Sequence, residues 1–427
     1  MKNLFRSLLP QWAINYFYHL PLAILANLFY GFPASKLKII GVTGTDGKTT
    51  TVNMIYQILR AAGKKVSMVS TINAFVGGKK YDTGFHITSP DPFEVQMFAK
   101  KALDRGDEYL VCEVTSHALD QYRFWGVKFD IGVITNVTHE HLDYHKSFKN
   151  YLNTKLKLLK NVKHAVVNEN VIPAKVLRSR GPQDRGAGIY TNNWIPYQVR
   201  DDKKLVTFGL EKGDFNQKDV KLKLKIPGNY NIENALAALA VSLSLGIDQK
   251  TARKSLESFE GLIGRMEEVK NHKGLKIVID FAHTPNGLEQ ALRTLRSQYG
   301  SGKLISLIGC EGFRDVGKRV MMGEIAQRLS DIVIVSAVDP RGQMETINLQ
   351  ITQGAKRAGA KIGENFFVIE NRQKAIDFAI NNLAKIKDVV GIFGKGHEKS
   401  MNLDGKVEIP WSDEEASKKA LMADKGD

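Results

Sequence analysis

A glycine-rich stretch followed by a lysine and two threonines has the residue types of a phosphate-binding loop. Residues 41–50 read GVTGTDGKTT. The glycines allow a tight turn in which backbone N–H groups face an anion at the start of a helix. Lys48 can reach the β- and γ-phosphates of a nucleotide, and the Thr49 hydroxyl can bind Mg²⁺. Val42 stands where the strict Walker pattern has its first glycine, so the alternative is a glycine turn followed by a threonine-rich cap.

Carboxylate, amide and imidazole side chains follow two apolar runs further along the chain. Glu113 lies near the end of the first run, and Asn136 ends the second. Ligands of parallel α/β proteins gather beyond the carboxyl ends of the strands, and carboxylate and carbonyl oxygens suit Mg²⁺. Histidines at 117, 139, 141 and 145 leave zinc as an alternative, although no cysteine joins them and their spacing matches no closed zinc site. A solvated polar loop is a further alternative.

The elements that must position these groups alternate between strands and helices. An apolar run at 38–42 precedes the glycine-rich loop, and a helical pattern through 52–59 follows it. Such alternation predicts a mostly parallel sheet covered on both faces. Turn signals over 184–225 predict a small antiparallel excursion. Further strands of this first series are expected at 109–114, 131–136 and 165–168.

A second α/β series begins near Gly264, with the domain boundary expected within 261–267. The predicted fold is therefore α/β, with a central P-loop-type ATPase domain and a C-terminal Rossmann-like domain. We expect residues 1–36 to form an apolar N-terminal segment, 37–262 the central domain and 263–427 the C-terminal domain. The strands of the second domain are expected at 276–280, 304–308, 332–336, 365–369 and 389–393.

The motifs occur in the order found in the Mur ligases of peptidoglycan synthesis, and the chain resembles that family over about residues 37–420. Its nearest resemblance is to the members called UDP-N-acetylmuramyl-tripeptide synthetases. The matching stretches include GTDGKTT at 44–50, EVTSHAL at 113–119, HEHLDYH at 139–145, GRME at 264–267 and GKGHE at 394–398. The resemblance implies an ATP-dependent, ADP-forming ligase that phosphorylates a substrate carboxylate and then forms an amide bond. Through peptidoglycan it implies a part in cell wall biogenesis, cell shape and cell division.

The resemblance also implies a set of residues for ATP and Mg²⁺. Glu113 and His141 match the family's metal-binding glutamate and histidine. Lys155, in a YLNTK stretch, matches a lysine that the family carbamylates, which would turn a repelling ammonium into an anionic ligand. The implied catalytic residues are Lys48, Glu113, Lys155, Arg265 and His283. The implied metal ligands are Thr49, Glu113, His141 and Lys155. The implied ATP-binding residues are Gly44, Thr45, Asp46, Gly47, Lys48, Thr49, Thr50, Asn231, Asn234, Arg265 and Asp280.

Substrate residues follow from the same resemblance. A muramyl peptide acceptor would be held by Thr88, Ser89, Ser116 and Arg123. A free amino acid would be recognised by Arg314, Asp339, Arg341, Gly394 and Glu398. The family reads diaminopimelate with Asp-Asn-Pro-Arg, whereas residues 338–341 here read VDPR. Asp339 would face an ammonium group, and both diaminopimelate and lysine remain candidates, with diaminopimelate favoured.

A second departure is the short stretch before the phosphate loop, which leaves no room for the family's usual N-terminal UDP-binding domain. The acceptor could then carry a lipid or no handle in place of UDP. A non-catalytic nucleotide-binding membrane scaffold is the alternative from another class, and folylpolyglutamate synthase is the rival among ligases. The GKGHE and EVTSHAL stretches argue against that rival.

Composition limits the class of partner and the compartment. The net charge is +16, but the basic residues are scattered, so we expect no nucleic-acid binding. Two cysteines without a spacing motif indicate a reducing, cytoplasmic compartment. Residues 7–35 contain no Asp, Glu, Lys or Arg, and they include three prolines. They either pack as helices against the protein or lie in a membrane interface as a peripheral contact. We expect a monomer.

Overall fold

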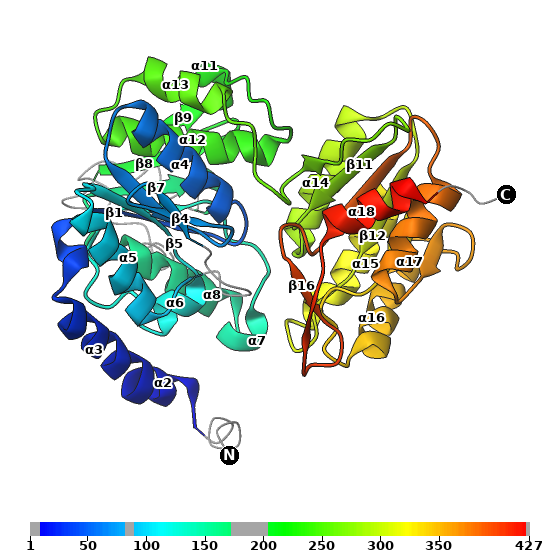
Figure 1. Ribbon diagram of the computed structural model, residues 1–427, viewed down its shortest axis with the longest axis horizontal. Coiled ribbons are helices and arrows are strands. Elements are labelled where there is room, and N and C mark those ends of the chain that lie inside the picture. The colour runs from blue at the N-terminus through cyan, green and yellow to red at the C-terminus, as the bar shows by residue number, and fades with distance from the viewer. Residues whose placement is uncertain (1–8, 82–88, 172–203, 424–427) are drawn as a thin grey trace, which may run out of the picture. The chain divides into compact units, whose positions relative to one another are not determined.

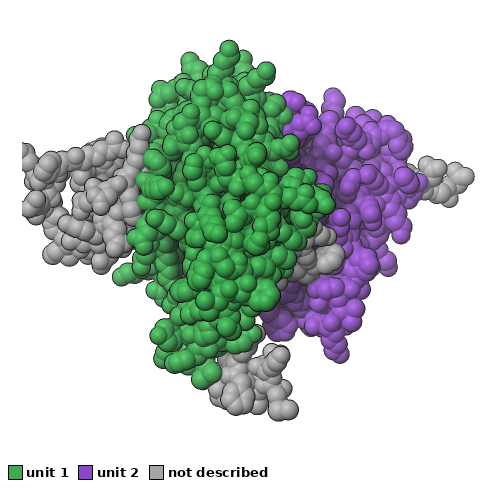
Figure 2. All heavy atoms as spheres, turned by 60° about the vertical axis from the view of Figure 1, so that its left-hand side comes forward, with its two compact units in different colours: residues 1–137, 147–224, 230–259 green, residues 138–146, 225–229, 260–427 purple. Residues whose placement is uncertain are grey.

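The chain is described by a computed structural model that covers residues 9–81, 89–171 and 204–423. Its contacts divide it into two compact units, coloured separately in Figure 2. Unit 1 comprises residues 1–137, 147–224 and 230–259, and unit 2 comprises 138–146, 225–229 and 260–427. The predicted site residue Thr88 and the first part of the predicted excursion, residues 184–203, lie outside the described residues.

Unit 1, most of which is coloured from blue to green in Figure 1, is built on a nine-stranded sheet in the order β4-β3-β2-β5-β1-β6-β7-β8-β9. Neighbouring strands pair in parallel except β2 with β3 and β3 with β4. Because β5, β1 and β6 are adjacent, their carboxyl ends meet at one edge. The bounds are β1 Lys38–Thr43, β2 Val66–Val69, β3 Ala74–Val76, β4 Lys79–Tyr81, β5 Tyr109–Glu113, β6 Phe129–Ile134, β7 His164–Asn168, β8 Lys204–Gly209 and β9 Phe215–Asn216.

Helices cover both faces of this sheet. Side chains of α5 and α8 join one apolar core with the strands, whereas α4 packs on the other face against β1, β2 and β5. Helix α5 begins at a capping box in which Asp91 and Glu94 satisfy each other's backbone N–H groups. The helices are α2 Gln11–Ile14, η1 Asn15–His19, α3 Leu20–Tyr30, η2 Pro33–Lys36, α4 Lys48–Ala61, α5 Pro92–Asp104, α6 Ser116–Asp120, α8 Phe148–Leu156, η3 Lys157–Leu159, η4 Glu169–Val171, α11 Gln217–Val220, α12 Asn229–Ser244 and α13 Gln249–Glu257.

Two expectations about unit 1 are decided by these elements. The described part of the predicted antiparallel excursion is parallel: β8 pairs with β7 in the register Val166↔Val206, and β9 pairs in parallel with β8. For these described residues the prediction was wrong, because turn signals are local, whereas strand direction is set by long-range pairing. Residues 11–30 are helical and pack on the unit, and none of the described helices is long and apolar enough to cross a membrane.

Unit 2 contains a six-stranded sheet in the order β10-β11-β15-β12-β13-β14, parallel except for β10. One apolar core lies under α14, α15 and α16, and a second lies under α17, η5 and α18. The strands are β10 Glu267–Glu268, β11 Lys276–Asp280, β12 Leu304–Ile308, β13 Ile332–Val335, β14 Phe366–Val368, β15 Val389–Phe393 and a hairpin of β16 Ser400–Asn402 with β17 Glu408–Pro410. The helices are α7 Leu142–His145, α14 Pro285–Gln298, α15 Gly317–Leu329, α16 Met344–Arg357, α17 Arg372–Asp377, η5 Phe378–Leu383 and α18 Asp413–Met422.

The segment 138–146 follows β6 in the chain but belongs to unit 2. Glu140 accepts a hydrogen bond from the buried Lys318 at 3.2 Å, and the Leu142 N–H donates to Asp315 at 3.3 Å. His139 lies 3.4 Å from Asp315. The HEHLDYH stretch at 139–145 is thus held by Asp315 and Lys318, at the start of α15.

Candidate active site

The glycine-rich loop joins β1 to α4 in the strand–loop–helix geometry of a phosphate site. Gly44 and Gly47 have φ values of 156° and 80°. A Cβ at Gly44 would lie 1.8 Å from the Thr135 hydroxyl, and one at Gly47 would lie 2.2 Å from the Asn234 amide oxygen. Both positions therefore require glycine for space as well as for backbone conformation.

The rest of the loop is fixed by the residues that follow β6. The Asp46 N–H donates to Asn136 Oδ1 at 2.9 Å, and Asn136 Nδ2 donates to Asp46 O at 3.1 Å. Thr135 also donates to Asp46 O, at 2.6 Å. Lys48 folds over the loop and donates to Gly44 O at 3.2 Å and Thr45 O at 2.8 Å. The predicted phosphate residues form one preorganised structure at the start of α4.

Glu113 brings a buried carboxylate to this loop. Its side chain accepts hydrogen bonds from Thr49 Oγ1 at 2.9 Å and from the Thr71 N–H at 3.0 Å, and the residue is 2% exposed. Lys155 is 1% exposed and donates to Gly44 O at 2.6 Å, with its ammonium 4.4 Å from the centre of the Tyr151 ring. Three of the four predicted metal residues thus border the phosphate loop, whereas His141 lies in unit 2.

These oxygens fit Mg²⁺ better than zinc. A carboxylate and a hydroxyl beside a phosphate loop are the hard donors that Mg²⁺ takes together with nucleotide phosphates. Among the described residues, no three His, Cys, Asp or Glu side chains gather closely enough to hold a metal ion. Thr49 and Glu113 are the hydroxyl and carboxylate donors that the structure brings together at this loop.

The two asparagines predicted near the adenine come to the same loop from α12. Asn234 Oδ1 accepts a hydrogen bond from Thr51 Oγ1 at 3.3 Å and lies against Gly47. Asn231 pairs with Asn234 at 3.4 Å, and both are buried. The start of α12 therefore borders the nucleotide site within unit 1.

The predicted acceptor residues form a second group around Ser89. Arg123 donates to Ser89 O at 2.9 Å, and Ser89 Oγ donates to Glu113 O at 3.2 Å. The Thr115 N–H donates to Ser89 Oγ at 3.0 Å, and Ser116 begins α6 directly after this residue. Ser89, Ser116 and Arg123 are therefore linked by hydrogen bonds and chain continuity to the strand that carries Glu113.

In unit 2, three separate motifs meet around the Phe281 ring. The Arg265 guanidinium lies 4.5 Å from its centre, and the rings of His283 and His397 lie 4.5 Å and 5.1 Å away. Asp280 holds the turn by accepting from the Met266 N–H at 2.8 Å. A Cβ at Gly264 would lie 2.1 Å from the His397 backbone nitrogen, so this close approach also requires glycine.

A second cluster in unit 2 combines arginines with a carboxylate. Arg314 lies 3.3 Å from Glu311. Burial would raise the pKa of Glu311, but Lys318, Arg314, His283 and Arg341 lower it to about 2. Arg341 lies in a turn in which both it and Asp339 have positive φ values, 49° and 46°. Non-glycine residues in this region are held there by their surroundings and cluster at functional sites.

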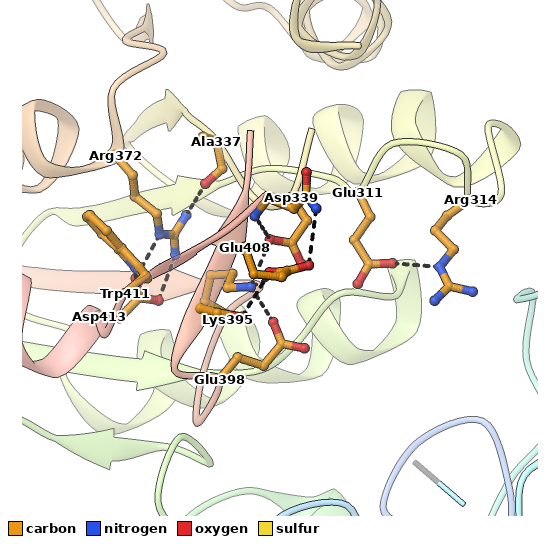
Figure 3. Close-up of polar contacts among 12 residues, drawn as sticks. Glu311, Arg314, Ala337, Asp339, Arg372, Lys395, Glu398, Glu408, Trp411 and Asp413 are labelled. Carbon is orange, nitrogen blue, oxygen red and sulfur yellow. Dashed lines mark hydrogen bonds and ion pairs between the residues drawn. The ribbon is translucent and has the colours of Figure 1, made fainter. Parts of the chain in front are cut away.

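Figure 3 shows what holds that turn: Lys395 lies between the carboxylates of Asp339 and Glu398. Lys395 donates to both Asp339 oxygens, at 3.0 and 3.1 Å, and Asp339 also accepts from the Asn402 N–H at 2.8 Å. Burial would lower the pKa of Lys395, but Glu398 and Asp339 raise it. The ammonium group that Asp339 faces is therefore that of the protein's own Lys395, whereas the sequence led us to expect one from the amino acid.

Several residues of these clusters were missed by sequence reasoning. Glu311 follows β12, and its position beyond a strand end is the one signal that could have found it. Arg372 is fully buried and ties the ends of two strands, donating to Ala337 O at 3.1 Å and Phe393 O at 2.9 Å (Figure 3). It also forms a bidentate ion pair with Asp413, at 2.7 Å to each carboxylate oxygen. No local sequence pattern predicts a pair between residues so far apart in the chain.

A phosphate loop with a carboxylate at the neighbouring strand end, and a second α/β unit with charged side chains beyond its strands, fit the ATP-dependent ligase class that the sequence motifs resemble. The Mur ligase middle domain matches residues 42–242, and the Mur ligase glutamate ligase domain matches residues 264–396. The chain therefore belongs to the Mur ligase family and is an ATP-dependent, ADP-forming amide ligase.

Named relatives agree with this assignment. The chain is 38% identical over 389 residues to the UDP-N-acetylmuramoyl-L-alanyl-D-glutamate–2,6-diaminopimelate ligase of Clostridium botulinum, covering 88% of this chain and 76% of that protein. It is 34% identical over 422 residues to the Clostridioides difficile ligase of the same name, covering 94% and 82%. These relatives carry the diaminopimelate ligase name rather than the tripeptide synthetase name expected from the motifs.

Solved structures extend the comparison to the fold. A structure of a ligase with the same name as these relatives matches with a TM-score of 0.55 at 26% identity, covering 90% of this chain and 78% of that one. Folylpolyglutamate synthase from Mycobacterium tuberculosis matches with a TM-score of 0.68 at 17% identity, covering 95% and 96%. At that identity the second likeness concerns the fold alone.

Proposed function

We propose that this ligase adds an amino acid with a second ammonium group, diaminopimelate in preference to lysine, to a muramyl dipeptide in peptidoglycan synthesis. ATP would phosphorylate the terminal carboxylate of the acceptor, and the amine of the amino acid would displace phosphate from the acyl phosphate. The observation that carries the proposal is the pairing of Glu113 with Thr49 at the phosphate loop, in a chain that is 38% identical to the diaminopimelate ligase of Clostridium botulinum.

The residues of unit 1 have roles in phosphoryl transfer. Lys48 would neutralise charge on the β- and γ-phosphates, while the fixed backbone of the loop orients them. Thr49 and Glu113 would hold Mg²⁺, which supplies electrostatic stabilisation of the transferring group when bound. Ser89 and Arg123 would hold the acceptor next to the strand that carries Glu113. Arg265 of unit 2 would add a further positive charge toward the γ-phosphate.

Lys155 is proposed to carry a carbamate. Its amine is buried and lies 2.6 Å from Gly44 O, so it borders the phosphate loop. An ammonium would repel Mg²⁺ there, whereas a carbamate would offer anionic oxygens. Removal of dissolved CO₂ should then lower activity, and bicarbonate should restore it. Activity that is indifferent to both treatments would contradict the modification.

The charges of unit 2 support a diamino acid as the incoming substrate. Asp339 and Glu398 both pair with Lys395, so this cluster holds two carboxylates and one ammonium. Glu398 is the most exposed of the three side chains, at 14%. It is therefore suited to an ammonium of the amino acid, while Arg314 and Arg341 are suited to its carboxylates. Diaminopimelate offers both kinds of group at its far end, which favours it over lysine.

The decisive experiment supplies ATP, Mg²⁺ and UDP-linked or lipid-linked muramyl dipeptide with a panel of amino acids, and identifies products by mass. We expect a tripeptide product with diaminopimelate, and ADP release that depends on both acceptor and amino acid. ATP hydrolysis indifferent to both would instead indicate the nucleotide-binding scaffold. Glutamate addition to folate would indicate folylpolyglutamate synthase. Comparison of the product yields from the two acceptors shows whether the enzyme uses the UDP-linked or the lipid-linked dipeptide.

We place this activity in the cytoplasm, where ATP is available, and expect the protein to act as a monomer. Both remain predictions. Light scattering on the purified chain at enzymatic concentrations tests the second.

A further inference from the structure

The helices at the start of the chain bury their small side chains and expose their large ones. We call residues 11–30, which form α2, η1 and α3, the N-terminal arm; Figure 1 shows it in dark blue along the edge of unit 1. Its buried residues are Ala13, Asn15, Ala23, Ala26 and Asn27. The exposed large apolar and aromatic residues of the arm and its flanks are Leu9, Trp12, Tyr16, Phe17, Tyr18, Leu25, Leu28, Phe29 and Phe32.

Polar contacts attach the arm to the rest of unit 1. Asn15 Nδ2 donates to Asp120 Oδ2 at 2.8 Å, and Asn27 Nδ2 donates to Trp125 O at 2.8 Å. Helix α3 also packs along α5, where the Tyr30 ring meets Phe93. An ordinary surface helix turns its large apolar side chains to the core and its polar side chains to water, whereas this arm leaves its large apolar side chains in water.

The exposed side chains form stripes along the arm. Trp12 and Tyr16 are spaced i, i+4, and Leu25, Leu28 and Phe29 are spaced i, i+3, i+4, so each group shares a helix face. Phe17 is 71% exposed and Phe29 is 74% exposed. Contiguous exposed apolar surface of this kind marks an interaction site.

The chemistry of the arm matches the boundary of a lipid bilayer. Residues 7–35 contain no Asp, Glu, Lys or Arg, whereas Lys2, Arg6, Lys36 and Lys38 flank them and the chain carries a net charge of +16. Tryptophan and tyrosine favour the headgroup region, and basic flanks favour anionic lipids. None of the described helices can span a bilayer, which leaves an arm lying in the interface plane.

We propose that the N-terminal arm is a docking surface for an anionic membrane, with Trp12, Phe17, Leu28 and Phe29 inserted among the headgroups. The segment that receives the arm, residues 120–126, also carries Arg123. Docking would therefore hold the acceptor-side residues of unit 1 close to the lipid surface. This inference rests on the surface of the arm alone and does not require the proposed substrate.

The test is sedimentation of the full-length protein with vesicles of phosphatidylcholine alone or with about one-third phosphatidylglycerol. We expect the wild type to bind the anionic vesicles, with a blue shift in emission that Trp12→Phe reduces. The double variant Phe17→Ser/Phe29→Ser should bind at least about tenfold more weakly. Its ligase activity in vesicle-free buffer should be unchanged, because neither side chain belongs to the active site.

A matched control keeps the test specific. Leu349→Ser/Ile386→Ser removes two apolar side chains that are 64% and 73% exposed in unit 2, and it should leave vesicle binding unchanged. The proposal is overturned if the wild type stays in the supernatant with anionic vesicles, or if both double variants bind equally. It is also overturned if light scattering shows a dimer that only the arm variant dissociates, while vesicle binding is absent.

Discussion

Lys48 is the side chain on which phosphoryl transfer most depends. Its ammonium lies over the loop, within hydrogen-bond distance of Gly44 O and Thr45 O, so a triphosphate would meet a charge already in place. Lys48→Ala should lower kcat/KM at least about 100-fold, which is typical for the loss of one transition-state donor. Steady-state ADP release measures this. Lys64→Ala, at an exposed position in the connection that follows α4, serves as the control, and undiminished activity in Lys48→Ala would refute the role.

Asp339 should set the charge available to the incoming amino acid. In Asp339→Asn, Lys395 would retain only Glu398 as an anionic partner and would neutralise it more completely. The KM for diaminopimelate should then rise about tenfold, a change worth 1.4 kcal/mol, while the KM for ATP should not change. Asp404→Asn, on the exposed tip of the β16–β17 hairpin, is the control. A KM for the amino acid equal to that of the wild type would count against the charge argument.

His397 should make stability depend on pH. Burial, helped by Arg265, Lys395 and His283, lowers its pKa to about 3 from an ordinary value of 6.5. The unfolded chain therefore binds this proton first as the pH falls, so the free energy of unfolding rises with pH between about 3 and 6.5 and levels off above. Urea denaturation across that range measures the slope. His397→Gln should flatten it; an identical slope in the variant would assign the effect to other groups.

At the scale of elements, Arg372 joins the carboxyl ends of β13 and β15, from which the 338–341 turn and the GKGHE loop continue. Removing one member of a fully buried ion pair leaves an uncompensated charge, so Arg372→Met should destabilise unit 2 by about 3–5 kcal/mol. Urea denaturation followed by the fluorescence of Trp411, which donates to Asp413, reports this. The exposed pair Arg293–Glu289 is the control, because Arg293→Met should cost less than about 1 kcal/mol.

A double-mutant cycle distinguishes the Arg372–Asp413 ion pair from simple packing of the two side chains. If Arg372 and Asp413 act as a pair, Arg372→Met/Asp413→Leu should cost less than the sum of the two single changes. Additive costs would show that each residue stabilises unit 2 through separate contacts.

Much of the element order was predictable because it depends on local patterns. Apolar runs bounded by turns located most strands to within a residue or two, and the predicted bounds 276–280, 304–308 and 389–393 agree with β11, β12 and β15. The glycine-rich loop was predictable because steric limits at Gly44 and Gly47 leave few alternatives. The mostly parallel sheets followed from the alternation of strands and helices.

What the sequence could not reveal depends on contacts between distant residues. The direction of β8 is set by pairing with β7 across about thirty-five residues of chain, and the segment 138–146 joins unit 2 because Lys318 and Asp315 hold it. The sequence showed that Asp339 adds a negative charge to this turn. It did not show that Lys395 would neutralise part of that charge. The N-terminal arm was recognisable in the sequence as an apolar stretch. Only the structure shows that its alanines are buried and most of its aromatic residues are exposed.

At the scale of the whole molecule, the two units carry different parts of the proposed reaction. The phosphate loop, Glu113 and Lys155 belong to unit 1, whereas the residues suited to the amino acid belong to unit 2. Formation of the acyl phosphate and its use by the amine should therefore be separable by mutation. Arg265 is the exception, since it lies in unit 2 but is assigned to the phosphoryl group.

Trapping the acyl phosphate tests this division. With ATP and the muramyl dipeptide but no amino acid, Arg341→Ala should still form a species that hydroxylamine captures, because Arg341 acts only on the incoming amino acid. The same variant should lose tripeptide formation by at least about tenfold, since one bidentate carboxylate contact is worth more than 1.4 kcal/mol. Lys48→Ala should lose both signals together, because no phosphoryl group is transferred. Equal loss of captured acyl phosphate in the two variants would mean that amino-acid recognition and phosphoryl transfer are not separable, and the assignment of one step to each unit would be wrong.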